Sequence, residues 1–485
     1  MLEIESHLYL KKFVSENQLD WKHIFAFGRI FSRSLRKSDN YLINSEIFKT
    51  NKWMAAFLIS LFLNPRDTIC IMKEDDFKYI LKIYCNQIKK LGFDFIQADN
   101  ELTFKTHKIT FMSYEEFIHR KFYIDSLRKH TLIFTAAENL KKNLKDASRL
   151  SLLKKDWFND VPQDCLSYDE LKRAYDFLKK KFFLKFISNQ KKIFLEESEI
   201  EILISLFTKY SHISKKFLHI KMALLSEWAC WAVLDNEKFE WALMLEPVDP
   251  TFLIAPLSKV NHFIFLSSLR QDYFLQKYLK NANLDIKLTI NFKSDFPEKD
   301  ILIYVPTKQA LPNNPLYIQS TFDKCNKIIL LSKGITIILS NNMNIKIEIA
   351  TKLASIYGGK VLLEKIPPIR NNNFIICASF DWWINNLHIL NPPDQIVIPL
   401  LPIPDMSEPI NQITASFNKK ISKDWFRDFM IPDTFEILDK SVAPLRINSG
   451  KLFLLDGRVN QRKWARDIID MIHPSKYIHQ LIPFE

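Results

Sequence analysis

Two stretches near the end of the 485-residue chain decide the fold: residues 395–409, QIVIPLLPIPDMSEP, and residues 424–474, DWFRDFMIPDTFEILDKSVAPLRINSGKLFLLDGRVNQRKWARDIIDMIHP. The first is an apolar, strand-like run that ends in a Leu-Pro-Ile-Pro turn. The second contains an aromatic helix, a helix that starts at a proline, and a strand that ends with Asp456 and Arg458. Short apolar strands that alternate with helices are typical of a parallel sheet covered on both faces. We therefore expect an α/β domain over residues 316–485.

The same alternation opens the chain, and it predicts a first parallel-sheet domain over residues 1–150. Residues 151–240 instead carry apolar side chains at helical spacing with few turn residues, which predicts an all-helical insertion. We expect residues 241–315 to complete the first domain and, in the proline-rich run Pro306–Pro315, to form the linker to the second. The expected strands are Tyr41–Asn44, Thr68–Met72, Lys108–Met112, Thr131–Phe134, His262–Leu266, Ile301–Val305, Thr336–Leu339, Lys360–Leu363, Phe374–Ala378, Gln395–Leu400 and Lys451–Leu455.

Composition bounds the class of protein. A hydrophobic content of 47% allows large cores, and the length predicts two or three domains. The formal net charge of +13 favours an anionic partner such as nucleic acid, although Lys-rich solvated helix faces would give the same excess. The six cysteines are far apart, which argues against a thiolate-bound zinc or iron–sulfur site. With no signal-peptide pattern and no long apolar run, we expect a soluble cytoplasmic protein that makes no membrane contact.

The order of elements after residue 395 resembles the C-terminal domain of DinG/XPD-type superfamily-2 DNA helicases. That family has a Leu-Pro turn with an acidic-Pro step, then a Q-x-x-G-R-x-x-R segment, then a strand ending in LD-x-R. The resemblance runs from about residue 20 to about residue 475. It implies two RecA-like domains of the P-loop NTPase type, with the helical insertion lying within the first of them. It also implies an ATP-dependent helicase, a hydrolase with ATP and magnesium as cofactors. The scattered cysteines argue against the iron–sulfur cluster that XPD-type enzymes carry in their insertion.

The glycine-rich phosphate loop that this family carries after its first strand has no glycine here. Glycines let backbone N–H groups wrap the phosphates while a lysine neutralises charge. The corresponding stretch, residues 40–58, reads NYLINSEIFKTNKWMAAFL; Lys52 stands at the lysine, Asn51 at the preceding glycine and Trp53 at the magnesium-binding hydroxyl. The resemblance therefore offers Lys52 and Thr50 as nucleotide-binding remnants. The alternative interpretation of Lys52 is a solvated lysine at a helix start.

The D-E-A-H motif of the family supplies carboxylates for magnesium and for the attacking water. Here the strand His130–Phe134 runs into TAAENL, so that Thr135 stands at the Asp, Ala136 at the Glu and Glu138 at the His. The resemblance makes Glu138 a candidate catalytic remnant. The alternative is an acidic residue that favours a helix N-terminus. Farther along, Phe263–Leu269 (FIFLSSL) resembles the family's TSATL motif, which links hydrolysis to domain movement.

The second half of the family's ATP site has arginines in Q-x-x-G-R-x-x-R that stabilise charge on the transferred phosphoryl group. Aligned on LDKSVAPLR, the Gln position is Asp439 and the final Arg is Arg446, the one arginine retained. The alternative for Arg446 is an ion pair at a helix end. We interpret Asp456 and Arg458 as a structural pair at a strand end.

In CASFDWWINN, at the place of the family's SFWEGVD, Trp382 and Trp383 are candidates for base stacking or for core packing.

Because several essential positions are replaced, the sequence predicts a DinG/XPD-like helicase homologue that binds single-stranded DNA or RNA and in which ATP hydrolysis is weak or lost. Binding can outlast catalysis, since phosphate neutralisation needs only Lys and Arg. The alternative is a non-enzymatic scaffold for DNA repair or replication proteins, built on a helicase fold, with residues 151–240 as the docking surface.

Overall fold

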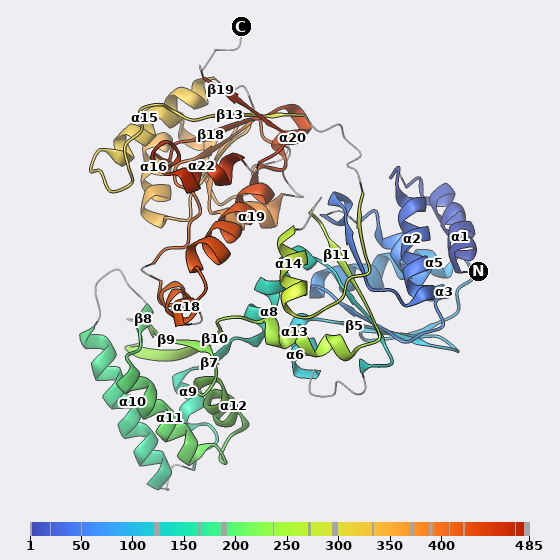
Figure 1. The fold of residues 1–485 in the computed structure, drawn as a ribbon, viewed down its shortest axis with the longest axis horizontal. Helices are drawn as coiled ribbons and strands as arrows, with labels where there is room; N and C mark the ends of the chain where they lie inside the picture. The colour runs from blue at the N-terminus through green and yellow to red at the C-terminus, as the bar shows by residue number, and fades with distance from the viewer. Residues whose placement is uncertain are drawn as a thin grey trace. The chain divides into compact units, whose positions relative to one another are not determined.

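A computed structural model gives the fold (Figure 1). It describes residues 2–19, 21–49, 51–120, 127–162, 166–185, 192–235, 237–269, 273–292, 299–331, 334–368, 373–387, 390, 392–406, 408–420, 422–470 and 472–479. The chain forms two compact units, residues 1–293 with 405–421, and residues 294–404 with 422–485. Each contains a largely or wholly parallel sheet, which confirms the predicted α/β architecture of two RecA-like lobes.

The first sheet has the strand order β12-β1-β11-β6-β2-β5-β4-β3. All pairs are parallel as far as β5, and the β4–β3 hairpin is added antiparallel at the edge. Four predicted strands are confirmed almost to the residue, because each is a short, mainly apolar run that is buried on both faces. The strands are β1 (Tyr41–Asn44), β2 (Thr68–Ile71), β3 (Ile96–Ala98), β4 (Glu101–Thr103), β5 (Lys108–Met112), β6 (Thr131–Phe134), β11 (His262–Ser267) and β12 (Leu288–Asn291).

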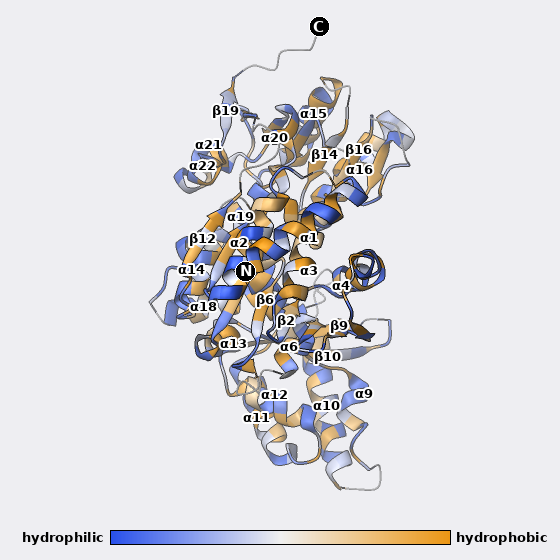
Figure 2. Ribbon diagram, turned by 90° about the vertical axis from the view of Figure 1, so that its right-hand side faces the viewer, coloured by the Kyte–Doolittle hydropathy of each residue, from blue (hydrophilic) through white to orange (hydrophobic). Residues whose placement is uncertain are grey.

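Helices cover both faces of this sheet, and each face has its own apolar core. Figure 2 shows apolar residues along the strands and in α3 (Met54–Leu63), in which every residue except Leu63 is buried. One face carries α1 (Leu2–Asn17), α2 (Ile24–Lys37), α3 (Met54–Leu63), α4 (Glu74–Tyr79), a π-helical turn (Ile80–Tyr84) and α5 (Cys85–Lys89). The other carries α6 (Tyr114–Arg120), α8 (Leu140–Ser148), α13 (Thr251–Ile254) and α14 (Tyr273–Asn281).

The insertion differs from the all-helical expectation, because it contains a four-stranded antiparallel sheet of order β7-β10-β9-β8. The two long strands of this sheet have the sequences WACWAVLD and EWALMLEP. Both are so apolar that a strand periodicity cannot be distinguished from a helical one. The strands are β7 (Leu150–Leu152), β8 (Lys192–Phe194), β9 (Trp228–Asp235) and β10 (Glu240–Pro247). The helices are α9 (Lys154–Phe158), α10 (Leu166–Leu184), α11 (Glu197–Tyr210) and α12 (Lys215–Leu224).

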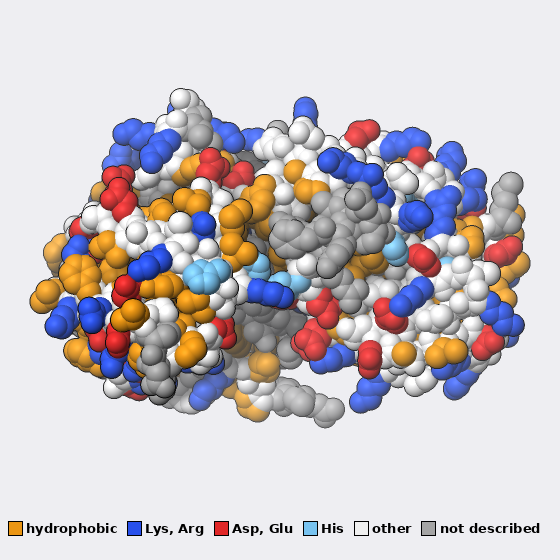
Figure 3. Space-filling model, turned by 90° about the horizontal axis from the view of Figure 1, so that it is seen from below, with side chains coloured by type: hydrophobic (Ala, Val, Ile, Leu, Met, Phe, Trp, Pro, Cys, Tyr) orange, Lys and Arg blue, Asp and Glu red, His pale blue; other side chains and the backbone are white. Residues whose placement is uncertain are grey.

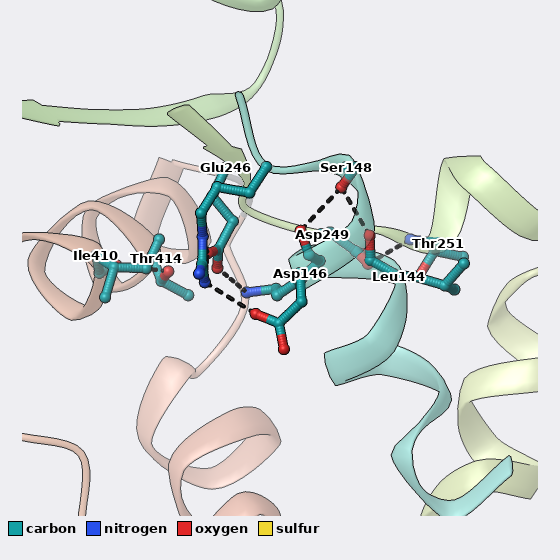
Figure 4. A network of polar contacts seen from close by, with 10 residues as sticks. Leu144, Asp146, Ser148, Glu246, Asp249, Thr251, Ile410 and Thr414 are labelled. Carbon is teal, nitrogen blue, oxygen red and sulfur yellow. Dashed lines mark hydrogen bonds and ion pairs between the residues drawn. The ribbon is translucent and has the colours of Figure 1, made fainter. Parts of the chain in front are cut away.

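The base of the insertion is pinned by an ion-pair network (Figure 4). Glu246, near the end of β10, is buried and accepts hydrogen bonds from the Arg149 guanidinium at 2.6 and 3.0 Å. Arg149 also bonds Asp146 on α8 at 3.0 Å, so the outgoing and returning chain segments are held together at one point. Figure 4 shows Ile410 and Thr414 of a further helix beside this pair.

That helix is α18 (Pro409–Lys420), which belongs by sequence to the second lobe but packs on the insertion. It lies against β8 and β9. An ion pair at 2.5 Å joins Lys192 of β8 to Glu408, just before the helix. Its apolar side chains add to the core of the insertion: Ile410, Ile413 and Phe417. The chain therefore runs from the second lobe into the first unit and back again through a single helix.

The second sheet is parallel throughout, with the order β15-β16-β14-β17-β18-β13-β19. Its two faces form separate cores beneath α15 and α16 and beneath α17, α19, α20 and α22. The strands are β13 (Ile301–Tyr304), β14 (Thr336–Leu339), β15 (Val361–Leu363), β16 (Ile375–Ala378), β17 (Gln395–Ile398), β18 (Lys451–Leu454) and β19 (Ser475–Ile478). The helices are α15 (Tyr317–Leu330), α16 (Met343–Tyr357), α17 (Phe380–Asn386), α19 (Ile431–Val442), α20 (Leu445–Asn448), α21 (Arg458–Gln461) and α22 (Lys463–Asp470).

One boundary needs correction. Strand β13 pairs in parallel with β18 and β19, so residues 301–304 belong to the second sheet and do not complete the first domain. Residues 306–315 consequently follow a strand inside the second unit and do not link the two lobes. Within the described part of the chain, no helix is long and apolar enough to cross a membrane.

We predict that Phe417→Ala loosens α18 without unfolding the lobes, because the half-buried ring packs on the insertion core while both sheets lie elsewhere. Deleting a half-buried aromatic ring should cost about 1–3 kcal/mol locally. Hydrogen–deuterium exchange should speed up in residues 409–420 and stay unchanged in β14 and β17. The exposed Ser416→Ala on the same helix is the matched control; equal effects of both variants would contradict the packing role.

Candidate nucleotide site

The carboxyl ends of parallel strands are where ligands bind in open α/β sheets, and the motif remnants of the first lobe lie there. Strand β11 pairs with β1 on one side and β6 on the other. Lys52 follows β1 and Glu138 follows β6, so the topology places the two on the same edge, one strand apart. The fold thus brings together the segments that the sequence singled out in this lobe.

Aromatic side chains fill the place after β1 where a phosphate loop would lie. The chain leaves the strand through Ser45, whose N–H donates to the Ser267 carbonyl at 2.9 Å, and turns through a short 3-10 helix, Glu46–Lys49. Trp53 is buried at 4% exposure, with its ring centroid 5.2 Å from Phe48 and 6.5 Å from Phe27. A cradle for phosphate needs backbone N–H groups open to the ligand. This packing does not fit a nucleotide triphosphate.

The residues beside Trp53 are engaged in the same packing. The Asn51 carbonyl accepts from the Met54 N–H at 3.2 Å and from the Tyr84 hydroxyl at 2.7 Å. Lys52 is exposed at the start of α3. Thr50, the other candidate for nucleotide binding, lies outside the described residues. Lys52 therefore remains a candidate by position alone.

The segment in place of D-E-A-H serves as a joint between two loops. Thr135 is buried and its N–H donates to the Ile71 carbonyl at 3.0 Å, while Ala136 has a left-handed φ of 49°. Both carboxylate oxygens of Glu138 accept from Ser268, one from the N–H and one from the hydroxyl, each at 2.8 Å. Ser268 belongs to FIFLSSL. Glu138 thus couples the two motif remnants physically, whereas Thr135 and Ala136 offer no carboxylate for magnesium or water.

Arg446, the candidate from the second lobe, is buried at 5% exposure. Its guanidinium donates to Asp439 at 2.9 Å and to the His473 carbonyl at 2.8 Å. Asp439 stands where the family has Gln, so the replacement supplies the very carboxylate that binds the surviving arginine. This geometry gives Arg446 a structural role at the corner between α19 and α20.

Asp456 and Arg458 form the strand-end pair that we interpreted as structural. The buried Asp456 carboxylate accepts from the Leu401 N–H at 2.9 Å and from the Arg458 guanidinium at 2.6 Å. It thereby fixes the Leu-Pro turn after β17 to the end of β18. Gly457 is needed between them, because a Cβ there would lie 2.6 Å from the Ala310 carbonyl oxygen.

Sequence reasoning missed a polar network at the carboxyl edge of the second sheet. Lys346 on α16 is buried at 6% exposure and donates to Glu364 at 2.6 Å. Glu364, after β15, also accepts from the Ser379 N–H at 2.9 Å. Although partial burial opposes it, the Lys346 ammonium and the Ser379 N–H lower the pKa of Glu364. The only sequence signal was a lysine at a position that otherwise continues an apolar helix face.

The two adjacent tryptophans of α17, Trp382 and Trp383, differ in their surroundings. Trp383 is buried at 1% exposure, and its indole N–H donates to the Ser441 carbonyl at 2.9 Å, so it cannot present a face to a base. Trp382 is half-exposed and packs one side on the core. Only Trp382 remains a candidate stacking platform.

Across the described residues, no group of three or more His, Cys, Asp and Glu side chains could hold a metal ion. The cysteines in that part of the chain are buried: Cys70, Cys85, Cys230, Cys325 and Cys377. Burial raises the pKa of the Cys85 thiol to about 12, which keeps it protonated and unreactive near neutral pH.

We predict that Arg446→Met destabilises the second lobe, because Met keeps the apolar stem but leaves the Asp439 carboxylate and the His473 carbonyl without their donor. The loss should be about 1–3 kcal/mol in unfolding free energy. Urea denaturation followed by circular dichroism measures it. Arg466→Met, an exposed arginine on α22, is the control. If the two variants unfold at the same urea concentration, the structural role of Arg446 is wrong.

No protein-family model matches the chain. A search of curated proteins also finds no match. Solved structures do resemble it. An apo XPD structure and an XPD helicase structure each have 14% identity and a TM-score of 0.57; they cover 94% and 95% of this chain and 100% of their own. The XPD protein Xpd4 of S. tokodaii has 13% identity and a TM-score of 0.53, with 88% and 94% covered. The chain therefore has an XPD-like helicase fold.

Proposed function

We propose that this protein is a nucleic-acid-binding member of the helicase fold in which ATP hydrolysis is weak or lost. The observation that carries the proposal is the combination of an XPD-like fold over nearly the whole chain with an aromatic cluster at the phosphate position. The fold supports a helicase ancestry, and the cluster argues against a working nucleotide site. We therefore propose that the chain is a DinG/XPD-like helicase homologue that binds nucleic acid, with single-stranded DNA or RNA as the ligand.

Loss of hydrolysis follows from several independent replacements. Phosphoryl transfer needs a phosphate cradle, a metal-binding carboxylate and a cation on the transferred group. In this chain the buried Trp53 fills the place of the phosphate cradle. Thr135 and Ala136 stand where the carboxylates would be. Arg446, the one arginine retained, is bound to Asp439. A repair of any one position would leave the others defective. ATP and magnesium are therefore not proposed as working cofactors.

Nucleic-acid binding does not require those groups. The chain has 68 Lys and Arg against 55 Asp and Glu, and backbone phosphates are bound by charge without a catalytic loop. On the face drawn in Figure 3, basic side chains are interspersed with acidic ones and do not form one continuous basic surface. We therefore propose moderate affinity with weak sequence preference, since phosphate contacts do not read base edges.

A scaffold for repair or replication proteins is the second candidate, and one observation favours it. Leu218, Met222 and Leu225 project from one side of α12 and its end with 43%, 58% and 59% exposure. Their spacing of four and three residues puts them on one helix face. Figure 3 shows hydrophobic side chains gathered toward its left, over the insertion. An exposed apolar stripe of this kind suits a protein partner.

Fluorescence anisotropy with labelled single-stranded DNA and RNA across a salt series tests the main proposal. We predict binding whose logarithmic dependence on salt has a slope of about −2 to −4, which corresponds to roughly three to six neutralised phosphates. Trp382→Ala should weaken binding about fivefold or more if its ring stacks on a base. Trp464→Ala, also half-buried in the second lobe, is the control. If anisotropy does not rise even at low salt, nucleic-acid binding is refuted and the scaffold function is the remaining candidate.

A further inference from the structure

A cavity of about 540 Å³ opens at the amino-terminal edge of the first sheet, away from every motif discussed above. Its walls come from loops that precede β2, β6 and β11 and from the end of α2. Thr131 and His262 are the first residues of β6 and β11 and form its buried part. The full lining is Ser38, Arg66, Lys129, His130, Thr131, Asn261 and His262.

The lining has two permanent positive charges and no carboxylate. Arg66 and Lys129 reach the cavity from different loops. The guanidinium of Arg66 donates to the Ser38 hydroxyl, and neither cation has a carboxylate partner among the residues that the structure describes. A guanidinium has five N–H groups, so most of its donor capacity remains for a ligand.

The acidic residues next in sequence are engaged outside the cavity. Asp39 is paired with Lys287 at 2.5 Å, and this ammonium holds the pKa of Asp39 below its usual range. The Asp67 carboxylate accepts the Lys108 N–H at 2.7 Å. Neither carboxylate is bound to Arg66 or Lys129, so both cations keep N–H groups for a ligand.

The inner wall is polar, neutral and already satisfied. His262 contacts the Asp39 carbonyl at 3.0 Å through Nε2 and the Thr131 hydroxyl at 3.1 Å through Nδ1. Burial lowers its pKa to about 4, so the ring is neutral near pH 7 and must donate to the carbonyl and accept from the hydroxyl. This neutral wall, with the two exposed cations Arg66 and Lys129 at the mouth, favours an anionic ligand.

We propose that this cavity binds a phosphate group, held by Arg66 and Lys129 with the Asn261 amide as a further donor. Guanidinium groups match phosphate oxygens in geometry as well as charge. The phosphate can come from a free polyphosphate or from a nucleic-acid strand. The inference goes beyond the function proposed above, because it concerns the opposite edge of the sheet and holds for a free anion even if no strand binds.

Isothermal titration calorimetry of the whole chain with pyrophosphate, and anisotropy with a single-stranded oligonucleotide, test the site separately. For at least one ligand, Arg66→Ala and Lys129→Ala should each weaken binding about tenfold. Arg173→Ala and Lys172→Ala, which remove exposed cations from α10, should leave it within about twofold. Thermal melts of all four variants confirm that these surface changes leave the fold intact.

The two arms separate the sources of the phosphate. If the cavity variants lose affinity for pyrophosphate, the cavity binds a free anion. If they lose affinity only for the oligonucleotide, it binds the phosphate of a nucleic-acid strand. If wild-type protein binds neither ligand, or if the cavity variants match the α10 controls for both, the proposal is overturned. Pyrophosphate binding that depends on Arg66 would stand even if nucleic-acid binding failed.

Discussion

The burial of Trp53 against Phe48 and Phe27 is the constraint on which the functional interpretation depends. In a phosphate-binding loop, the turn between the first strand and the next helix must leave its N–H groups open to the ligand. Here the same turn closes over an aromatic core, and its carbonyls and amides are used by the protein. Aromatic rings bury large apolar areas. The packing therefore strengthens the first lobe at the place where a motor would have to stay open.

The polar remnants around this cluster have structural uses. Glu138 joins two loops through Ser268, and Arg446 is tied to the carboxylate of Asp439. Asp456 fixes the turn after β17. Glu138, Arg446 and Asp456 are thus all bound to other parts of the chain. These contacts join loops and strand ends within each lobe, which is consistent with a fold retained for binding.

Most strands of the parallel sheets could be predicted because they are short, mainly apolar runs, as in Thr131–Phe134 and Thr336–Leu339. The edge strands β12 and β19 could not be predicted, because they carry polar residues and are largely exposed. The hairpin of the insertion could not, since WACWAVLD is apolar at nearly every position and shows no period. Strand β13 was assigned to the wrong sheet because strand pairing is long-range: its partners begin at residues 451 and 475. The docking of α18 on the insertion has no local signal at all.

The candidate site divides along the same line. Motif order put Lys52 and Glu138 after two strands, β1 and β6, which the structure places on either side of β11. The partner of each side chain could not be predicted from spacing. In the sequence, Asp439 only replaces the glutamine of the family's motif, whereas in the structure it forms an ion pair with Arg446. The Lys346–Glu364 pair was invisible because its members belong to no motif.

The central claim is that the first lobe has no working nucleotide site, and calorimetric titration with a non-hydrolysable ATP analogue and magnesium tests it most directly. The account predicts no saturable binding tighter than about 1 mM, equivalent to roughly −4 kcal/mol, and no difference between wild-type protein and Lys52→Ala. Saturable binding in the micromolar range that Lys52→Ala abolishes would contradict it, because Trp53 would then have to leave its core to admit the phosphates.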